Sequence, residues 1–201
     1  MSEQKLNTEI RKKQIAQAAL NLITTQGLKN LSIAGVARRV GLVPSAIYRH
    51  FKTKDDLINS VLSHIQDMLL DNVKEVCRET SNSIDRLRRL LFRHIRLIRE
   101  NLGIPRIVFS EDVYAGPFER RKMVHGIITG YLDGVADIVR QGQKSGQILP
   151  DIDAATVSLI FLGLVQPAGL LWHMSNGSFD VTKYAEKAWK IFARAIRKDN
   201  F

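Results

Sequence analysis

Sulfur and catalytic motifs are scarce in this chain. Cys77 is its only cysteine, so a disulfide within the chain is excluded and a reducing cytoplasm is the favoured compartment. Because Cys77 falls in a helical pattern, a structural role is favoured over a redox role. The sequence has no G-x-S-x-G elbow, no glycine-rich phosphate loop with a lysine, and no H-E-x-x-H pair. We therefore expect neither an enzyme nor a bound cofactor.

Metal ligands at a useful spacing are also lacking. The five histidines are scattered, and none has a second histidine four residues away. Glu111 and Asp112 would form a metal site with His94 or His125 only if folding brought them together, and their spacing does not predict this. We expect ordinary surface or core-edge roles for these side chains, and no metal.

The chain has one long apolar run. Its N-terminus, MSEQKLNTEIRKK, has no apolar stretch, so we expect no secretory signal. Residues 154–174 have no charged side chain before His173, and this length would suffice for a membrane span. Gln166 and Pro167 dilute the run, and no basic cluster flanks it. Since a helix buried on all sides has the same composition, we expect a core or interface helix and no membrane.

Helical periodicity runs from end to end, and strand-like alternation is missing. The pattern predicts an all-α protein of about nine helices. The expected helices cover residues 8–26, 32–40, 44–51, 53–76, 83–101, 106–113, 117–144, 153–175 and 180–198. Asp153 and Asp180 are expected N-caps, and the glycines at 146 and 177 mark breaks.

Residues 31–54, LSIAGVARRVGLVPSAIYRHFKTK, contain two short amphipathic segments joined at Gly41. Ser32 suits the N-cap of the first segment, because its hydroxyl can accept a backbone N–H. Gly41 can adopt the left-handed conformation that ends a helix, and Pro44 suits the first turn of the next one. Thr53 and Asp56 then form a weak capping box for a long helix. A helix, a glycine turn and a second helix together predict a helix-turn-helix motif, whose second helix lies in the DNA major groove.

Positive charge is concentrated in the same region. Residues 1–54 carry ten Lys or Arg side chains against two Glu, which gives +8 of the whole-chain +10. A solvated basic face is the plain alternative. Polyanion binding fits better, because a concentrated positive face gains affinity by releasing counterions from phosphates.

At these residues the chain resembles the TetR family (TetR/AcrR type) of bacterial transcription regulators. The resemblance rests on a first helix over Ile10–Gly27, on Ser32-Ile-Ala-Gly-Val-Ala, and on Tyr48-Arg-His-Phe-Lys-Thr-Lys leading into Asp55-Asp56-Leu57. It implies a DNA-binding domain over residues 1–54 and a helical ligand-binding and dimerisation domain over residues 55–201. It also implies a cytoplasmic, ligand-responsive repressor that binds a palindromic operator as a homodimer. Val43 departs from the family, whose members often have Ser or Thr there, although a valine could touch a thymine methyl.

The resemblance and the side-chain chemistry together predict the DNA contacts. The first turn of the recognition helix should reach base edges, Tyr48 and Arg49 should contact phosphate or guanine, and His50 and Lys54 should contact the backbone. The candidate DNA-binding residues are Ser32, Val43, Pro44, Ser45, Ala46, Tyr48, Arg49, His50 and Lys54. Phe51, Ile47, Val40 and Leu57 are expected in the core of the domain.

The C-terminal part should dimerise and bind an effector. As the resemblance implies, helices over Asp153–Ser175 and Asp180–Lys198 should pair with those of a second copy, so that Leu162→Glu or Phe192→Glu would give monomers. A small apolar or aromatic effector is expected among the segments 83–101, 117–144 and 154–174. The candidate ligand-binding residues are Phe92, His94, Phe109, Tyr114, Phe118, His125, Ile128, Tyr131, Gln166 and Trp172.

A second function remains open on the sequence. The basic N-terminus could instead place an interaction module on an anionic membrane surface, without specific DNA binding. That alternative predicts one basic amphipathic helix with a bulky apolar face. Here the basic residues are spread over several short helices with glycine turns, which favours a folded DNA-binding domain.

Overall fold

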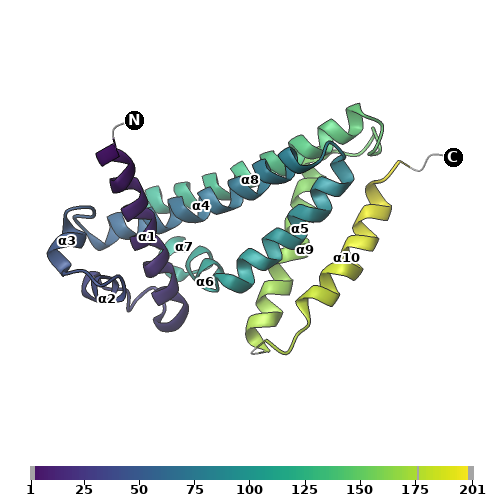
Figure 1. The fold of residues 1–201 in the computed structure, drawn as a ribbon. Coiled ribbons are helices and arrows are strands. Elements are labelled where there is room, and N and C mark those ends of the chain that lie inside the picture. The colour runs from purple at the N-terminus through teal and green to yellow at the C-terminus, as the bar shows by residue number, and fades with distance from the viewer. Residues whose placement is uncertain (1–2, 176, 199–201) are drawn as a thin grey trace. The chain divides into compact units, whose positions relative to one another are not determined.

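The structure is a computed structural model that describes residues 3–175 and 177–198, and this part of the chain is all-α, as predicted. It has ten helices where about nine were expected: α1 Glu3–Gln26, α2 Ile33–Arg39, α3 Pro44–Tyr48, α4 Lys54–Glu79, α5 Ser83–Glu100, α6 Gly103–Val108, α7 Glu111–Tyr114, α8 Phe118–Lys144, α9 Ala154–Met174 and α10 Val181–Ile196 (Figure 1). The described residues form no strand, and Ile148 and Arg197 make an isolated β-bridge.

Local chemistry produces the helix-turn-helix as predicted. The Ser32 hydroxyl accepts the Gly35 N–H at 3.1 Å and so caps α2. Gly41 has a φ of +68°, which a residue with a Cβ adopts only at a cost. Pro44 is at the start of α3, where its missing N–H leaves no hydrogen bond unmade. The recognition helix α3 ends at Tyr48 and not at Phe51 as expected. After it the His50 and Phe51 N–H groups both donate to the Ile47 carbonyl, at 2.9 and 3.0 Å.

The capping box before α4 is confirmed and is reciprocal. The Thr53 N–H donates to Asp56 Oδ2 at 2.9 Å, and the Asp56 N–H donates to Thr53 Oγ1 at 3.0 Å. Each group satisfies a backbone donor that a helix start leaves unpaired. The start of α4 is therefore held firmly, a few residues after the recognition helix.

The expected helix over residues 106–113 is wrong in its bounds. The chain forms α6 from Gly103 and α7 from Glu111, with Ser110 as the N-cap of α7. Pro105 lies in the first turn of α6, where no N–H is needed, so it does not break the helix. Gly103 is required here, because a Cβ would stand 2.4 Å from the Leu20 carbonyl oxygen of α1.

The chain divides into two compact units that alternate along it. The helix-turn-helix unit comprises Met1–Asp67 and Asn101–His125, and the C-terminal unit comprises Met68–Glu100 and Gly126–Phe201. In the helix-turn-helix unit α1 packs on α2 and α6, around a fully buried group of Ile15, Leu20, Ile23, Val36, Ile47 and Leu57. Of the residues predicted for this core, Ile47, Phe51 and Leu57 are buried and Val40 is half-buried.

In the C-terminal unit α5, α9 and α10 pack together (Figure 1). Asp153 and Asp180 cap α9 and α10 as predicted, accepting the Thr156 and Lys183 N–H groups at 2.7 and 2.9 Å. The α9 helix is long and apolar enough to cross a membrane by length and composition. One of its faces is buried in this unit, and the Phe161 ring lies 5.7 Å from that of Phe192. This burial matches the expectation of a core or interface helix.

Candidate nucleic-acid interface

The exposed side of the recognition helix carries most of the predicted DNA contacts. Pro44, Ser45, Tyr48 and Arg49 are exposed, and the Val43 side chain is 62% exposed. Ala46 is different, because it is only 7% exposed and belongs with Ile47 to the core. We therefore correct its assignment: a side chain that faces the protein interior does not reach base edges.

Val43 is the N-cap residue of α3 and makes no side-chain capping hydrogen bond. Its backbone is extended, with φ −79° and ψ 149°, so the side chain stands at the N-terminal end of the recognition helix. The exposed Val43 side chain makes no capping contact with the first turn of α3. It is available for a contact with another apolar group, such as a base methyl.

Two of the groups expected to meet the DNA backbone, Ser32 and Lys54, lie at helix starts. Ser32 already accepts the Gly35 N–H, so its hydroxyl proton is left for donation to a phosphate. The Lys54 ammonium donates to the Lys29 carbonyl at 3.0 Å, which joins the start of α4 to the loop before α2. An ammonium has three donors, so this bond holds Lys54 in place without preventing a phosphate contact.

His50 is half-buried beside a group of cations. Its pKa is lowered from the ordinary histidine value by burial first, and then by the charges of Lys12, Arg49 and Arg11. The imidazole is therefore mainly neutral near pH 7 in the free protein. Arg11 and Lys12 were not among the predicted contacts, although the basic run at residues 11–13 was visible in the sequence.

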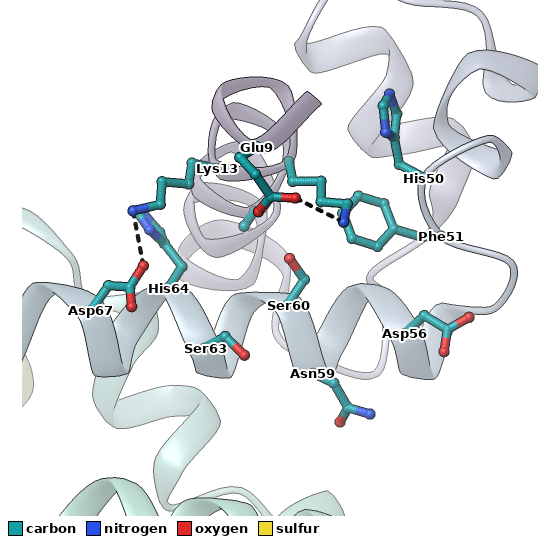
Figure 2. Close-up of a pocket in the computed structure, with 12 residues that line it drawn as sticks. Glu9, Lys13, His50, Phe51, Asp56, Asn59, Ser60, Ser63, His64 and Asp67 are labelled. Atoms are coloured by element: carbon teal, nitrogen blue, oxygen red, sulfur yellow. Dashed lines mark hydrogen bonds and ion pairs between the residues drawn. The ribbon is translucent and has the colours of Figure 1, made fainter. Parts of the chain in front are cut away.

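A polar pocket of about 430 Å³ lies beside this group, between α1 and α4 (Figure 2). Lys12 pairs with Glu9 at 3.2 Å, and the neighbouring Lys13 pairs with Asp67 of α4 at 2.9 Å. His64 Nε2 donates to Gln17 Oε1 at 2.9 Å, which leaves Nδ1 buried without a hydrogen-bond partner. The side chains that line the pocket come from Glu9, Lys12, Lys13, Ala16, His50, Phe51, Asp56, Asn59, Ser60, Ser63, His64 and Asp67.

The ten predicted effector contacts do not all gather in one place. Four are exposed and belong to the helix-turn-helix unit: Phe109, Tyr114, Phe118 and His125. The other six belong to the C-terminal unit, where Gln166 is exposed and Phe92, Ile128 and Trp172 are half-buried. His94 and Tyr131 are buried together, with His94 Nδ1 2.8 Å from the Tyr131 hydroxyl.

Two features of the C-terminal unit could serve a ligand. Burial lowers the pKa of His94 to about 4, so the imidazole of this hydrogen-bonded pair is neutral at pH 7. Trp172 lines a narrow apolar crevice with side chains of α5, α9 and α10, and Arg99 is the charged residue among them. Across residues 3–175 and 177–198, no three His, Cys, Asp or Glu side chains are arranged to hold a metal ion.

The recognition helix is exposed, the helices before and after it have capped starts, and basic side chains surround it. Together these features define a helix-turn-helix DNA-binding protein. The chain belongs to the TetR family of bacterial regulatory proteins: residues 15–61 match the model described as "Bacterial regulatory proteins, tetR family", and residues 63–195 match "YsiA-like protein, C-terminal region". It is thus a DNA-binding transcriptional regulator, as predicted.

Known proteins similar to this chain agree with the family. The fatty acid metabolism regulator protein of Bacillus subtilis is 21% identical over 183 residues, which cover 91% of this chain and 94% of that protein. The crystal structure of FadR from Bacillus subtilis in complex with stearoyl-CoA has a TM-score of 0.77 at 21% identity, covering 92% of this chain and 98% of that one. A putative transcriptional regulator from Saccharomonospora viridis, in complex with choline, has a TM-score of 0.80 at 20% identity, covering 95% of this chain and all of that one. At these identities the solved structures show the fold, and these relatives are described as regulators.

Proposed function

We propose that the protein is a cytoplasmic repressor that binds a near-palindromic operator as a homodimer and leaves it when a small effector binds. The exposed recognition face of Val43, Pro44, Ser45, Tyr48 and Arg49 carries this proposal. Within it, residues 1–54 contact DNA, and residues 55–201 dimerise and bind the effector. Two-fold symmetry suits a palindromic operator, because each half-site then meets the same surface.

A gel shift on the DNA upstream of the chain's own gene tests operator binding. On a confirmed site, Tyr48→Phe and Lys54→Ala should weaken binding to all sequences about equally, because phosphate contacts carry no sequence information. Lys54→Ala should also lower the salt slope of affinity by about one unit per charge removed. Ser45→Ala is the matched variant that should change sequence preference instead. Unchanged affinity and salt slope in Lys54→Ala would remove Lys54 from the interface.

The exposed side of α9 supports dimerisation through the last two helices. Leu159, Ile160, Leu170, Leu171 and Met174 are exposed large apolar side chains of α9, and Ile191 is another on α10. Large apolar side chains that gather on the exposed side of a helix mark an interaction site. Leu162 and Phe192, where the sequence predicts that Glu would give monomers, are buried within the protomer. Their substitution by Glu would therefore unfold the unit and not separate two copies.

For the effector we propose a molecule with a long apolar chain and an anionic head, of the acyl-CoA class. The similar FadR structure contains stearoyl-CoA, which supports this chemistry. Arg99 and Trp172 line an apolar crevice in the C-terminal unit that has no room for a water molecule as it stands, so it would have to open to admit the apolar chain. The neutral His94–Tyr131 pair could anchor a polar group of the effector's acyl chain. The α4 helix belongs to the helix-turn-helix unit up to Asp67 and to the C-terminal unit from Met68, so it is the element we expect to transmit the change.

Calorimetry with stearoyl-CoA, in the presence and absence of operator DNA, tests this coupling. An effector shifts the balance only by its different affinity for the two states, so a coupling of about 1–3 kcal/mol would weaken DNA binding roughly 5–150-fold. By linkage, operator DNA must weaken effector binding by the same factor. Equal effector affinity with and without DNA would refute the coupling, and free coenzyme A, which has the anionic head group without the apolar chain, is the matched control.

A further inference from the structure

Four side chains that are or can become cationic gather at one place in the helix-turn-helix unit. Arg11 and Lys12 come from α1, and Arg49 and His50 come from the segment that follows α3. Lys12 and His50 line the same pocket, and the charges of Arg11, Lys12 and Arg49 all act on the imidazole. We name this cluster the α1 anion site.

The acidic groups at this end of the pocket offset the cations only in part. Glu9 pairs with Lys12, with the Lys12 side chain 39% and the Glu9 side chain 50% exposed. Asp56 lines the same pocket, but its carboxylate accepts the Thr53 N–H at 2.9 Å in the capping box. The other charged groups of the pocket, Lys13 and Asp67, pair with each other.

We propose that the α1 anion site binds a DNA backbone phosphate, so that Arg11 and Lys12 of α1 join Arg49 and His50, which the sequence already predicts as DNA contacts. Gathered cations with incomplete pairing repel one another, and a phosphate relieves that repulsion while releasing counterions from the DNA. Arg49 offers a bidentate fork and Lys12 a point charge, which are the two chemistries that bind phosphate. The proposal rests on the proposed operator binding, because the phosphate belongs to the DNA that the recognition helix reads.

A proton should accompany this contact. In the free protein His50 is held neutral by burial and by neighbouring cations. The negative charge of a phosphate acts in the opposite direction and raises the pKa of His50 in the complex. Protein on DNA therefore binds more protons than free protein, so affinity rises as the pH falls from about 7.5 to about 5.5.

The neighbouring lysines provide a matched pair of variants. Lys12→Ala should weaken operator binding about fivefold and lower the salt slope by about one unit per half-site. Lys13→Ala removes the same charge one residue away, where Asp67 already pairs with it, and should leave the slope within about 0.3 units. Glu9→Gln removes the carboxylate that competes for Lys12 and should tighten binding about twofold to threefold. A gain in affinity cannot result from misfolding.

Fluorescence anisotropy with a confirmed operator, at several salt concentrations and pH values, measures both effects. His50→Gln should abolish the rise in affinity at low pH, whereas His64→Gln, at the other end of the pocket, should keep it. Equal salt slopes for Lys12→Ala and Lys13→Ala, or an unchanged pH profile in His50→Gln, would overturn the α1 anion site while wild-type operator binding stands. Wild-type protein that binds no DNA at all would instead overturn the proposed function.

Discussion

Val43 and His94 illustrate how single side chains depart from the usual chemistry of their surroundings. Val43 is an exposed apolar residue at the start of a helix that reads polar base edges, and His94 is a buried base. The position of Val43 at the start of the recognition helix was foreseen from the sequence. The partner of His94 was not, because Tyr131 is 37 residues away along the chain and helical periodicity relates only near neighbours.

At the residue scale we predict that Val43 reads a thymine methyl. Replacing that thymine by deoxyuridine removes one methyl group and should weaken binding by about 0.8 kcal/mol, or about fourfold. Val43→Ala should bind the thymine and deoxyuridine operators equally, and Ser45→Ala should still distinguish them. Competition binding with operators substituted one base at a time measures this. A thymine preference that persists in Val43→Ala would contradict the prediction.

We also predict that His94 makes the fold sensitive to acid. Its pKa is about 4 in the folded chain and about 6.5 when unfolded, so the unfolded state binds the proton first as the pH falls. The stability associated with neutral His94 is complete above pH 6.5 and decreases by about 3 kcal/mol down to pH 4. His94→Gln should remove this part of the acid dependence. Urea unfolding at pH 7 and pH 4.5 compares the two proteins, and parallel losses of stability would count against the assignment.

Helix starts hold the elements of the helix-turn-helix unit together. Ser32 and the Thr53–Asp56 pair cap α2 and α4, and these caps were readable from the sequence because they act over three residues. The division into α6 and α7 was not readable, since Pro105 can begin a helix as well as break one. A third connection joins helix starts far apart in sequence: Arg120 of α8, 8% exposed, donates to Asp55 of α4 at 2.6 Å.

At the element scale we predict that Arg120 and Asp55 are coupled in stability. Removing Asp55 leaves the buried Arg120 cation without its counterion. Asp55→Ala should therefore lower the free energy of unfolding more in the wild-type protein than in an Arg120→Met variant. Asp55 is largely exposed, so we expect a coupling of only about 1–2 kcal/mol. The exposed Lys29–Glu111 pair, at 3.6 Å in the same unit, is the control and should show about 0.5 kcal/mol or less. Additive losses at Arg120 and Asp55 in thermal unfolding would exclude the coupling.

The exposed face of α9 concerns the whole molecule. Its large apolar residues recur at helical spacing on the side that the C-terminal unit leaves uncovered. The low charge of residues 154–174 was visible in the sequence. The sequence did not predict which face of α9 is covered, because α9 is apolar all round and its pattern does not separate the two sides.

For the whole molecule we predict that Leu170→Glu gives a folded monomer. A charge on the exposed face of α9 should prevent two copies from burying that face, and the monomer should lose operator affinity because it holds one half-site. Leu162→Glu, eight residues earlier but buried, should instead lose helical structure. Sedimentation and circular dichroism distinguish these outcomes. A Leu170→Glu protein that remains dimeric at micromolar concentration would place the dimer interface elsewhere.

The two compact units alternate along the chain, and this order has a consequence during synthesis. The helix-turn-helix unit includes Asn101–His125 as well as Met1–Asp67, and α1 packs against α6 through the close approach at Gly103. A ribosome delivers residues in order, at about 5–20 residues per second. The DNA-binding unit therefore waits several seconds, with part of its α1 surface uncovered, until α6 and α7 leave the exit tunnel. A nascent chain stalled before residue 101 would carry the recognition helix but not its full support, so it is the stage at which chaperones should bind it most strongly.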